Sequence, residues 1–241
     1  GDLSQVIKRA RLAQKHLPEE LIWRVFAQIV SGLHACHRRT KTAQINRGSA
    51  GPQPLETSGS QRILHRDIKP ENILAGPHSE VLLLDWGLAK VWHPDSNSSG
   101  SGPAVESEKE SESAEQSHRS APPAIEDITL TGHGKAQGTV YYMSPEQLKQ
   151  DPLIDHRTDI FSLGAVLYEI LCGEKPAHGE KLHEVVDSVL NQQPAEAAAV
   201  AKYKVPTLLN DIAARCLDKN PDSRFQSMEE VIMLLQQDWM S

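Results

Sequence analysis

The chain has 241 residues, 39% hydrophobic residues and a formal net charge of −7, an ordinary composition for one large or two small globular domains. Residues 93–127 hold eight acidic and two basic side chains, so the rest of the chain is close to neutral, which disfavours nucleic acid as a partner. No apolar run reaches the roughly 18 residues of a membrane span. Three widely spaced cysteines predict no disulfide framework and a reducing, cytoplasmic setting.

Two helices are predicted in the N-terminal part. Residues 3–15 favour a short helix. Residues 18–38 favour a long amphipathic one, because apolar residues recur at helical spacing and Pro18 is followed by two glutamates that suit a helix start. Residues 40–61 are rich in Gly, Ser, Thr and Pro and predict a long loop.

Two short apolar runs, residues 73–74 and 81–84, flank Gly76-Pro77 and predict a small β-hairpin. Residues 93–128 combine nine serines with the acidic run and predict a disordered insert. Residues 159–172 are apolar nearly all round, which predicts a buried central helix that ends at Gly173. Further helices are predicted at residues 181–191, 207–218 and 227–238, so the expected fold is mainly α with one hairpin.

The run from Leu64 to Asn72 places a carboxylate, an ammonium and a carboxamide at offsets of zero, two and five residues, in Asp67, Lys69 and Asn72. Asp85-Trp86-Gly87 follows thirteen residues after Asn72. Phosphoryl transfer needs an aligned hydroxyl, a metal that bridges phosphates, and positive charge on the moving group. Asp67 can accept the hydroxyl proton, Lys69 can neutralise the γ-phosphate, and Asn72 and Asp85 are oxygen donors of the kind that Mg²⁺ takes.

On these residues, the chain resembles the C-terminal lobe of a eukaryotic-type Ser/Thr protein kinase, and especially the bacterial members of that superfamily. The resemblance covers residues 1–239 apart from the inserts at 40–61 and 93–128. It implies a mainly α lobe with a small β-hairpin at the catalytic and metal-binding loops. It also implies a transferase that uses ATP and Mg²⁺ and phosphorylates Ser or Thr hydroxyls of protein substrates.

The resemblance implies a role for each matching residue. Asp67 matches the catalytic base, Lys69 the phosphate-contacting lysine, and Asn72 and Asp85 the metal ligands. Thr139 would bond to Asp67 and Lys69. Asp2 would reach the nucleotide ribose, and Leu3 and Leu74 would contact the adenine. Trp86 stands where the family usually has Phe, a change expected to be tolerated because Asp85 is intact.

Residues 138–146 resemble the substrate-docking loop and the Ala-Pro-Glu motif that follows it, with Ser144 in place of Ala, and are here called the docking segment. The resemblance implies that Glu146 pairs with Arg224 and that Asp159 holds the backbone of the catalytic loop, residues 64–72. Arg66 implies control by a phosphate on the activation segment, shared with Lys90, and the nearest acceptor candidates are Thr129 and Thr131. The insert at 93–128 is either a solvated linker or a phospho-regulated, partner-binding segment.

Residues that the family places in an N-terminal β lobe are missing before Asp67, since that part has no G-x-G-x-x-G and no V-A-I-K-like lysine. The first residues, Gly1 to Ser4, include no initiator Met and do not form a signal-peptide pattern. We therefore expect either a fragment without the N-terminal lobe of a longer protein, which could be membrane-anchored, or a one-lobed relative. The chain alone should have poor kinase activity and expose an apolar surface around Leu3 and Leu74. The alternative function is a pseudokinase-like regulatory or scaffold module, which the retained Asp67, Lys69, Asn72 and Asp85 disfavour.

Overall fold

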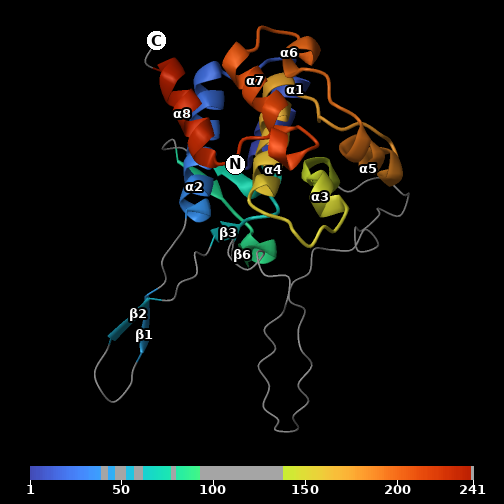
Figure 1. Cartoon of the computed structure of the whole chain (residues 1–241). Helices are drawn as coiled ribbons and strands as arrows, with labels where there is room; N and C mark the ends of the chain where they lie inside the picture. The colour runs from blue at the N-terminus through green and yellow to red at the C-terminus, as the bar shows by residue number, and fades with distance from the viewer. Residues whose placement is uncertain (39–42, 47–52, 57–61, 77–79, 93–137, 240–241) are drawn as a thin grey trace.

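A computed structural model describes residues 1–38, 43–46, 53–56, 62–76, 80–92 and 138–239, and these form a mainly helical body (Figure 1). The α-helices are α1 Leu3–Leu12, α2 Glu19–His37, α3 Pro145–Leu148, α4 Arg157–Cys172, α5 Leu182–Asn191, α6 Ala197–Val200, α7 Thr207–Cys216 and α8 Met228–Trp239. The strands are β1 Ala43–Asn46, β2 Gln53–Glu56, β3 Arg62–Leu64, β4 Ile73–Ala75, β5 Val81–Leu83 and β6 Lys90–Trp92.

Helix α4 is the axis of the body, as its apolar sequence predicts. Thirteen of its residues are buried, and it packs against α6 and α7 at the centre of Figure 1. Gly173 ends the helix with φ +77°, a left-handed conformation that glycine adopts without strain. The other long helices also form within one to three residues of their predicted bounds. Helix α1 stops at Leu12, short of the predicted residue 15, and Gln14 then takes φ +51°.

Within the described residues, three two-stranded antiparallel pairs accompany the helices: β1 with β2, β3 with β6, and β4 with β5. The β4–β5 pair confirms the predicted hairpin, with Ile73 opposite Leu83. The prediction that residues 40–61 form only a loop is wrong for β1 and β2, because neighbouring segments can pair through their backbones without an alternating apolar pattern. The insert at 93–128 lies outside the described residues.

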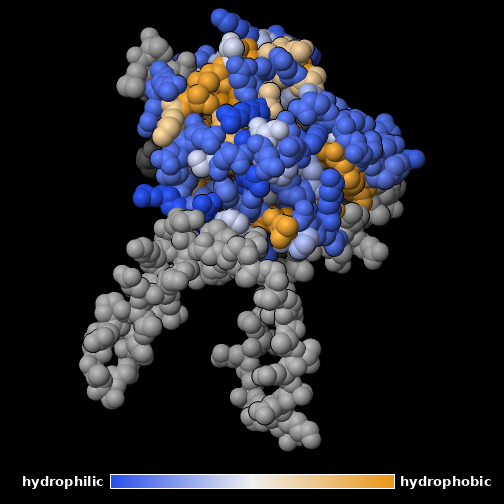
Figure 2. All heavy atoms as spheres, in the orientation of Figure 1, coloured by the Kyte–Doolittle hydropathy of each residue, from blue (hydrophilic) through white to orange (hydrophobic). Residues whose placement is uncertain are grey.

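The core joins the central helix to α1, α2 and the C-terminal helices, while the surface seen in Figure 2 is mostly hydrophilic with small apolar areas. Leu3 lies in this core with 1% of its surface exposed, so it contributes nothing to the apolar surface expected around Leu3 and Leu74, whereas Leu74 is half-buried and pairs with the exposed Leu82. Exposed apolar side chains lie instead on β5 and just after it, where Leu82 is 54%, Leu84 38% and Trp86 40% exposed. None of the described helices is long and apolar enough to cross a bilayer.

Candidate active site

The backbone that leads into Asp67 is fixed by one carboxylate from the start of α4. Asp159, which is fully buried, accepts hydrogen bonds from the backbone N–H groups of His65 and Arg66, each at 2.8 Å. His37 of α2 lies 2.8 Å from the same carboxylate through Nε2. Burial alone would raise the pKa of Asp159, but these bonds hold it below the usual value, so the carboxylate is ionised. The predicted anchoring of the loop by Asp159 is therefore present.

Asp67 lies at the centre of a compact polar cluster. The Lys69 ammonium donates to both of its carboxylate oxygens, at 3.0 and 2.8 Å, and the Asn72 amide donates to Oδ2 at 2.9 Å and to the Asp67 carbonyl at 2.9 Å. Lys69 also donates to the Thr139 hydroxyl at 3.2 Å. Of the two bonds expected for Thr139, the one to Lys69 is present, and among the described residues Thr139 makes none to Asp67. Four residues that the sequence singled out, from two distant segments, come together here.

A backbone hydrogen bond ties the Asp85 turn to the catalytic loop. The N–H of Leu84 donates to the Asn72 carbonyl at 2.8 Å, which extends the β4–β5 pairing to the residue before Asp85. Asp85 itself takes φ +60° and accepts from the Gly87 N–H at 3.3 Å. Asn72 and Asp85 therefore project from the same end of one hairpin.

Trp86 makes a polar contact with its indole N–H. That group donates to the Leu83 carbonyl at 3.1 Å, and the indole packs on His65 with ring centroids 4.5 Å apart. His65 in turn lies 3.0 Å from the Leu84 carbonyl, and burial lowers the pKa of its imidazole. A tryptophan is thus accommodated beside Asp85, as the sequence predicts.

The donor chemistry at the hairpin end suits Mg²⁺. Both hydrogen bonds of the Asn72 side chain use its amide nitrogen, which leaves Oδ1 out of them, and the Asp85 side chain is exposed. Across the described part of the chain, no group of three or more His, Cys, Asp or Glu residues could hold a metal. A site with one carboxylate and one amide oxygen fits an ion that keeps waters and substrate phosphates as its other ligands.

The residues expected to hold the nucleotide are less favourably placed. Gly1 accepts a hydrogen bond from the Ala75 N–H at 3.2 Å, and a β-bridge pairs Asp2 with the half-buried Leu74. The Asp2 carboxylate caps α1 by accepting from the Gln5 backbone at 2.8 Å and from its amide at 2.6 Å. Leu3, as the first residue of α1, turns into the core, so the expectation that it contacts adenine is wrong for this conformation.

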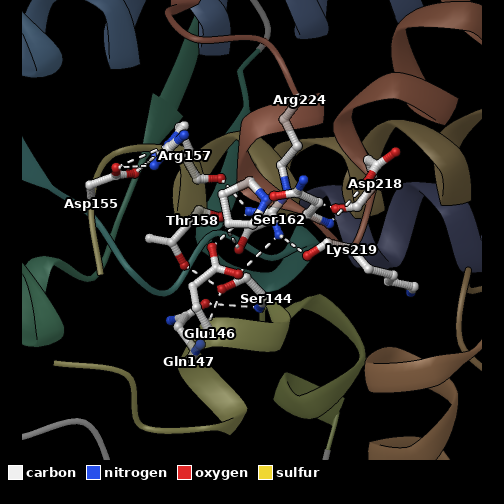
Figure 3. Close-up of polar contacts among 12 residues, drawn as sticks. Ser144, Glu146, Gln147, Asp155, Arg157, Thr158, Ser162, Asp218, Lys219 and Arg224 are labelled. Carbon is white, nitrogen blue, oxygen red and sulfur yellow. Dashed lines mark hydrogen bonds and ion pairs between the residues drawn. The ribbon is translucent and has the colours of Figure 1, made fainter. Parts of the chain in front are cut away.

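The segment after Thr139 is bound to the start of α4 and to the loop before α8, as Figure 3 shows, and also to the catalytic loop. Arg224, with no exposed surface, forms a two-pronged ion pair with Glu146 at 2.7 and 2.9 Å, as predicted. The Gln147 amide donates to the Arg66 carbonyl at 2.8 Å, and the Ser144 and Thr158 hydroxyls lie 2.6 Å apart. No sequence motif pointed to these last two contacts.

Arg66 is 6% exposed, has φ +68°, and its Nε has no hydrogen-bond partner among the described atoms. Burial lowers the pKa of its guanidinium. Its expected role in binding a phosphorylated activation segment remains a proposal, because Thr129 and Thr131 lie outside the described residues.

Comparisons with known proteins find one matching family model and several similar proteins. A family model described as "Protein kinase domain" matches residues 53–240. The chain is 32% identical over 229 residues to "G2-specific protein kinase nimA" of Emericella nidulans, covering 93% of the chain and 27% of that protein. It is 35% identical over 182 residues to "Serine/threonine-protein kinase PknD" of Protochlamydia amoebophila, covering 75% and 17%. With "Serine/threonine-protein kinase PknB" of Mycolicibacterium smegmatis, the identity is 30% over 179 residues, covering 74% and 23%.

Proposed function

This chain belongs to the protein kinase family, and on that premise we propose that it supplies the catalytic and substrate-docking half of an ATP- and Mg²⁺-dependent Ser/Thr protein kinase. The chain spans about a quarter or less of the length of these relatives, so activity and substrates are assigned here as proposals. The proposal rests chiefly on Asp67, whose carboxylate accepts hydrogen bonds from Lys69 and Asn72 at 2.8–3.0 Å, while Asp85 lies at the same end of the hairpin as Asn72.

In the proposed reaction, a substrate hydroxyl attacks the γ-phosphorus, its proton passes to the Asp67 carboxylate, and the bond to the ADP oxygen breaks. Lys69 neutralises the negative charge of the transferred group, a role suited to an ammonium placed beside the base. Asn72 Oδ1 and Asp85 would hold Mg²⁺, which when bound would neutralise phosphate charge. Asp159 keeps the base in place through the loop backbone.

We further propose that the body is the C-terminal lobe of the kinase and that a β-rich N-terminal lobe completes the nucleotide site. Support comes from the exposed row of Leu82, Leu84 and Trp86 beside the site, which a second lobe would cover. The Asp2 carboxylate would have to exchange its bond to Gln5 for a ribose contact. The 241-residue chain alone is accordingly expected to transfer phosphate poorly.

The test uses the full-length protein, radiolabelled ATP and a general protein substrate in Mg²⁺ buffer. Asp67→Asn should lower transfer by roughly 10²–10⁴-fold, since it removes the proton acceptor. The exposed Asp211 of α7 offers a matched control, and Asp211→Asn should leave transfer unchanged. Full activity in the Asp67→Asn protein would refute the assignment, and absence of transfer by the wild-type protein would favour a pseudokinase-like scaffold.

A further inference from the structure

Two adjoining cavities form a groove along α1 that begins at the catalytic loop. The first, of about 380 Å³, is lined by Glu71 of the catalytic loop, Tyr142, and Lys8 of α1. The second, of about 130 Å³, continues past the end of α1 to Tyr203. They share Ile7, Arg11 and Glu169 as lining residues, so they are parts of one surface, here called the α1 groove.

Basic side chains dominate the described lining of the α1 groove. Three carboxylates line it, and two of them already have partners. Glu169 accepts a 2.5 Å hydrogen bond from the Tyr142 hydroxyl, and Glu174 lies 3.8 Å from Arg11. Burial raises the pKa of Glu169. Five basic side chains line the same groove as these three carboxylates: Lys8, Arg11, Lys15, Lys175 and Lys202.

Lys175 places one of these charges beside the segment that would dock the substrate. Its ammonium lies 4.0 Å from the centroid of the Tyr141 ring and 5.7 Å from that of Tyr142, so it lies at the docking segment itself. A peptide whose acceptor hydroxyl reached Asp67 would bring its neighbouring side chains past Lys175 and Lys8. The groove is therefore positively charged where a substrate would pass.

We propose that the α1 groove binds acidic side chains of the substrate, so that the protein prefers Ser or Thr acceptors within runs of Asp and Glu. This inference rests on the proposed function, because it names the substrate class for the same site. The chain contains a sequence of this chemistry: residues 105–117 carry five glutamates and four serines but a single lysine. Charge complementarity thus argues for an acidic, serine-containing peptide as the occupant.

The direct test is peptide binding without nucleotide. A fluorescent peptide that copies residues 105–117 is titrated with the 241-residue chain, and its anisotropy is followed. The control peptide has its five glutamates replaced by lysine. We expect the acidic peptide to bind at least about tenfold more tightly, and its affinity to fall when salt is raised, because exposed charges are screened. Tighter binding of the lysine peptide would overturn the inference and assign the groove to cations through Glu71 and Glu169.

Charge-reversed variants locate the binding. Lys8→Glu with Lys175→Glu should weaken binding of the acidic peptide roughly tenfold or more, since each lost ion pair becomes a repulsion. Lys8→Glu with Lys202→Glu should also weaken binding of the acidic peptide, and this double variant replaces the first if the first fails to fold. Arg9→Glu with Lys149→Glu changes the net charge equally at two exposed sites outside the groove and should change affinity by less than about threefold. An equal loss in this control pair would overturn the inference.

The two proposals fail separately. Binding in the absence of nucleotide does not depend on phosphoryl transfer, so Asp67→Asn should lower transfer by the full-length protein as predicted above and leave peptide affinity unchanged. Loss of transfer in the wild-type protein would refute the proposed function, whereas absence of acidic-peptide binding would refute the assignment of the groove alone.

Discussion

Removal of Arg224 from its ion pair with Glu146 should be among the most destabilising single substitutions in the body. The Arg224 guanidinium has no exposed surface and donates to both Glu146 oxygens, at 2.7 and 2.9 Å (Figure 3). It also donates to three backbone carbonyls, those of Asp218 at 2.7 Å, Arg157 at 3.0 Å and Lys219 at 3.3 Å. One side chain thus joins the docking segment, the start of α4 and the loop before α8.

Arg224→Ala would leave a buried carboxylate without its counter-charge and three carbonyls without a donor. Removing one partner of a buried, hydrogen-bonded pair costs about 3–5 kcal/mol of unfolding free energy, most of which is the desolvation of the charge left behind. The matched control is Arg11→Ala. Arg11 lies 3.8 Å from Glu174 with side chains 63% and 49% exposed, and such surface pairs contribute less than about 1 kcal/mol.

The assay is urea unfolding of the 241-residue chain followed by far-ultraviolet circular dichroism. Arg224→Ala should lower the midpoint strongly at an unchanged slope, and Arg11→Ala should barely move it. The double variant Glu146→Leu with Arg224→Met should recover part of the loss, because it leaves no lone buried charge. If Arg224→Ala were as mild as Arg11→Ala, the assignment of stability to this pair would be refuted.

Three further predictions concern the core and its charges. Gly164→Ala should lower the unfolding free energy by about 1–3 kcal/mol, because an added Cβ would lie 2.4 Å from Cys216 Cβ. Gly32→Ala meets nothing within 4 Å in α2 and should be neutral or stabilising in the same urea assay. Burial raises the pKa of Cys216 to about 12, so a thiol reagent at pH 8 should modify it only after unfolding, and rapid native labelling found by peptide mapping would contradict this. The pKa of Asp159 in the folded chain lies below its usual value. Its contribution to the unfolding free energy is therefore full above the pKa of about 4 in the unfolded chain, and it is lost as pH falls through the folded pKa. Asp159→Asn should reduce the fall of the unfolding free energy at low pH. The same fall in the variant as in the wild-type chain would refute this prediction.

The sequence predicts the helices and the catalytic residues because both depend on local spacing. Asp67, Lys69 and Asn72 lie within six residues, and the turn that joins them leaves little choice of arrangement. Contacts between distant segments have no such local signal. The pairing of β3 with β6 involves three-residue strands, and the bond from Gln147 to the Arg66 carbonyl depends on how α3 is placed against the catalytic loop.

The wrong prediction that Leu3 contacts adenine shows the same limit of local sequence signals. Its position next to Asp2 suggests a ligand contact, but the start of α1 decides its direction. The Asp2 carboxylate caps the helix, and the first helical side chain then turns into the core, where Leu3 packs with 1% exposure. A helix start is visible in the sequence, whereas the face that it presents depends on what packs beside it.

The two halves of the candidate site differ in how firmly the chain itself holds them. The Asp67 side is fixed by Asp159 from α4 and by Lys69 and Asn72, in surroundings that are largely buried. The metal-binding side depends on Asp85, an exposed residue with φ +60°, and on Trp86, which is 40% exposed. Left-handed backbone occurs on both sides, at Arg66 and at Asp85, so the difference is one of burial: the exposed Asp85 turn has fewer packed neighbours to hold it and is the less stable part.

That difference indicates where control of the proposed activity would act. A segment that covered Trp86 would bury apolar surface and restrict the Asp85 turn, while the base would already be in position. The free-energy cost of assembling the site therefore lies mainly in ordering the Asp85 turn, because the contacts that orient Asp67 are internal to the helical body.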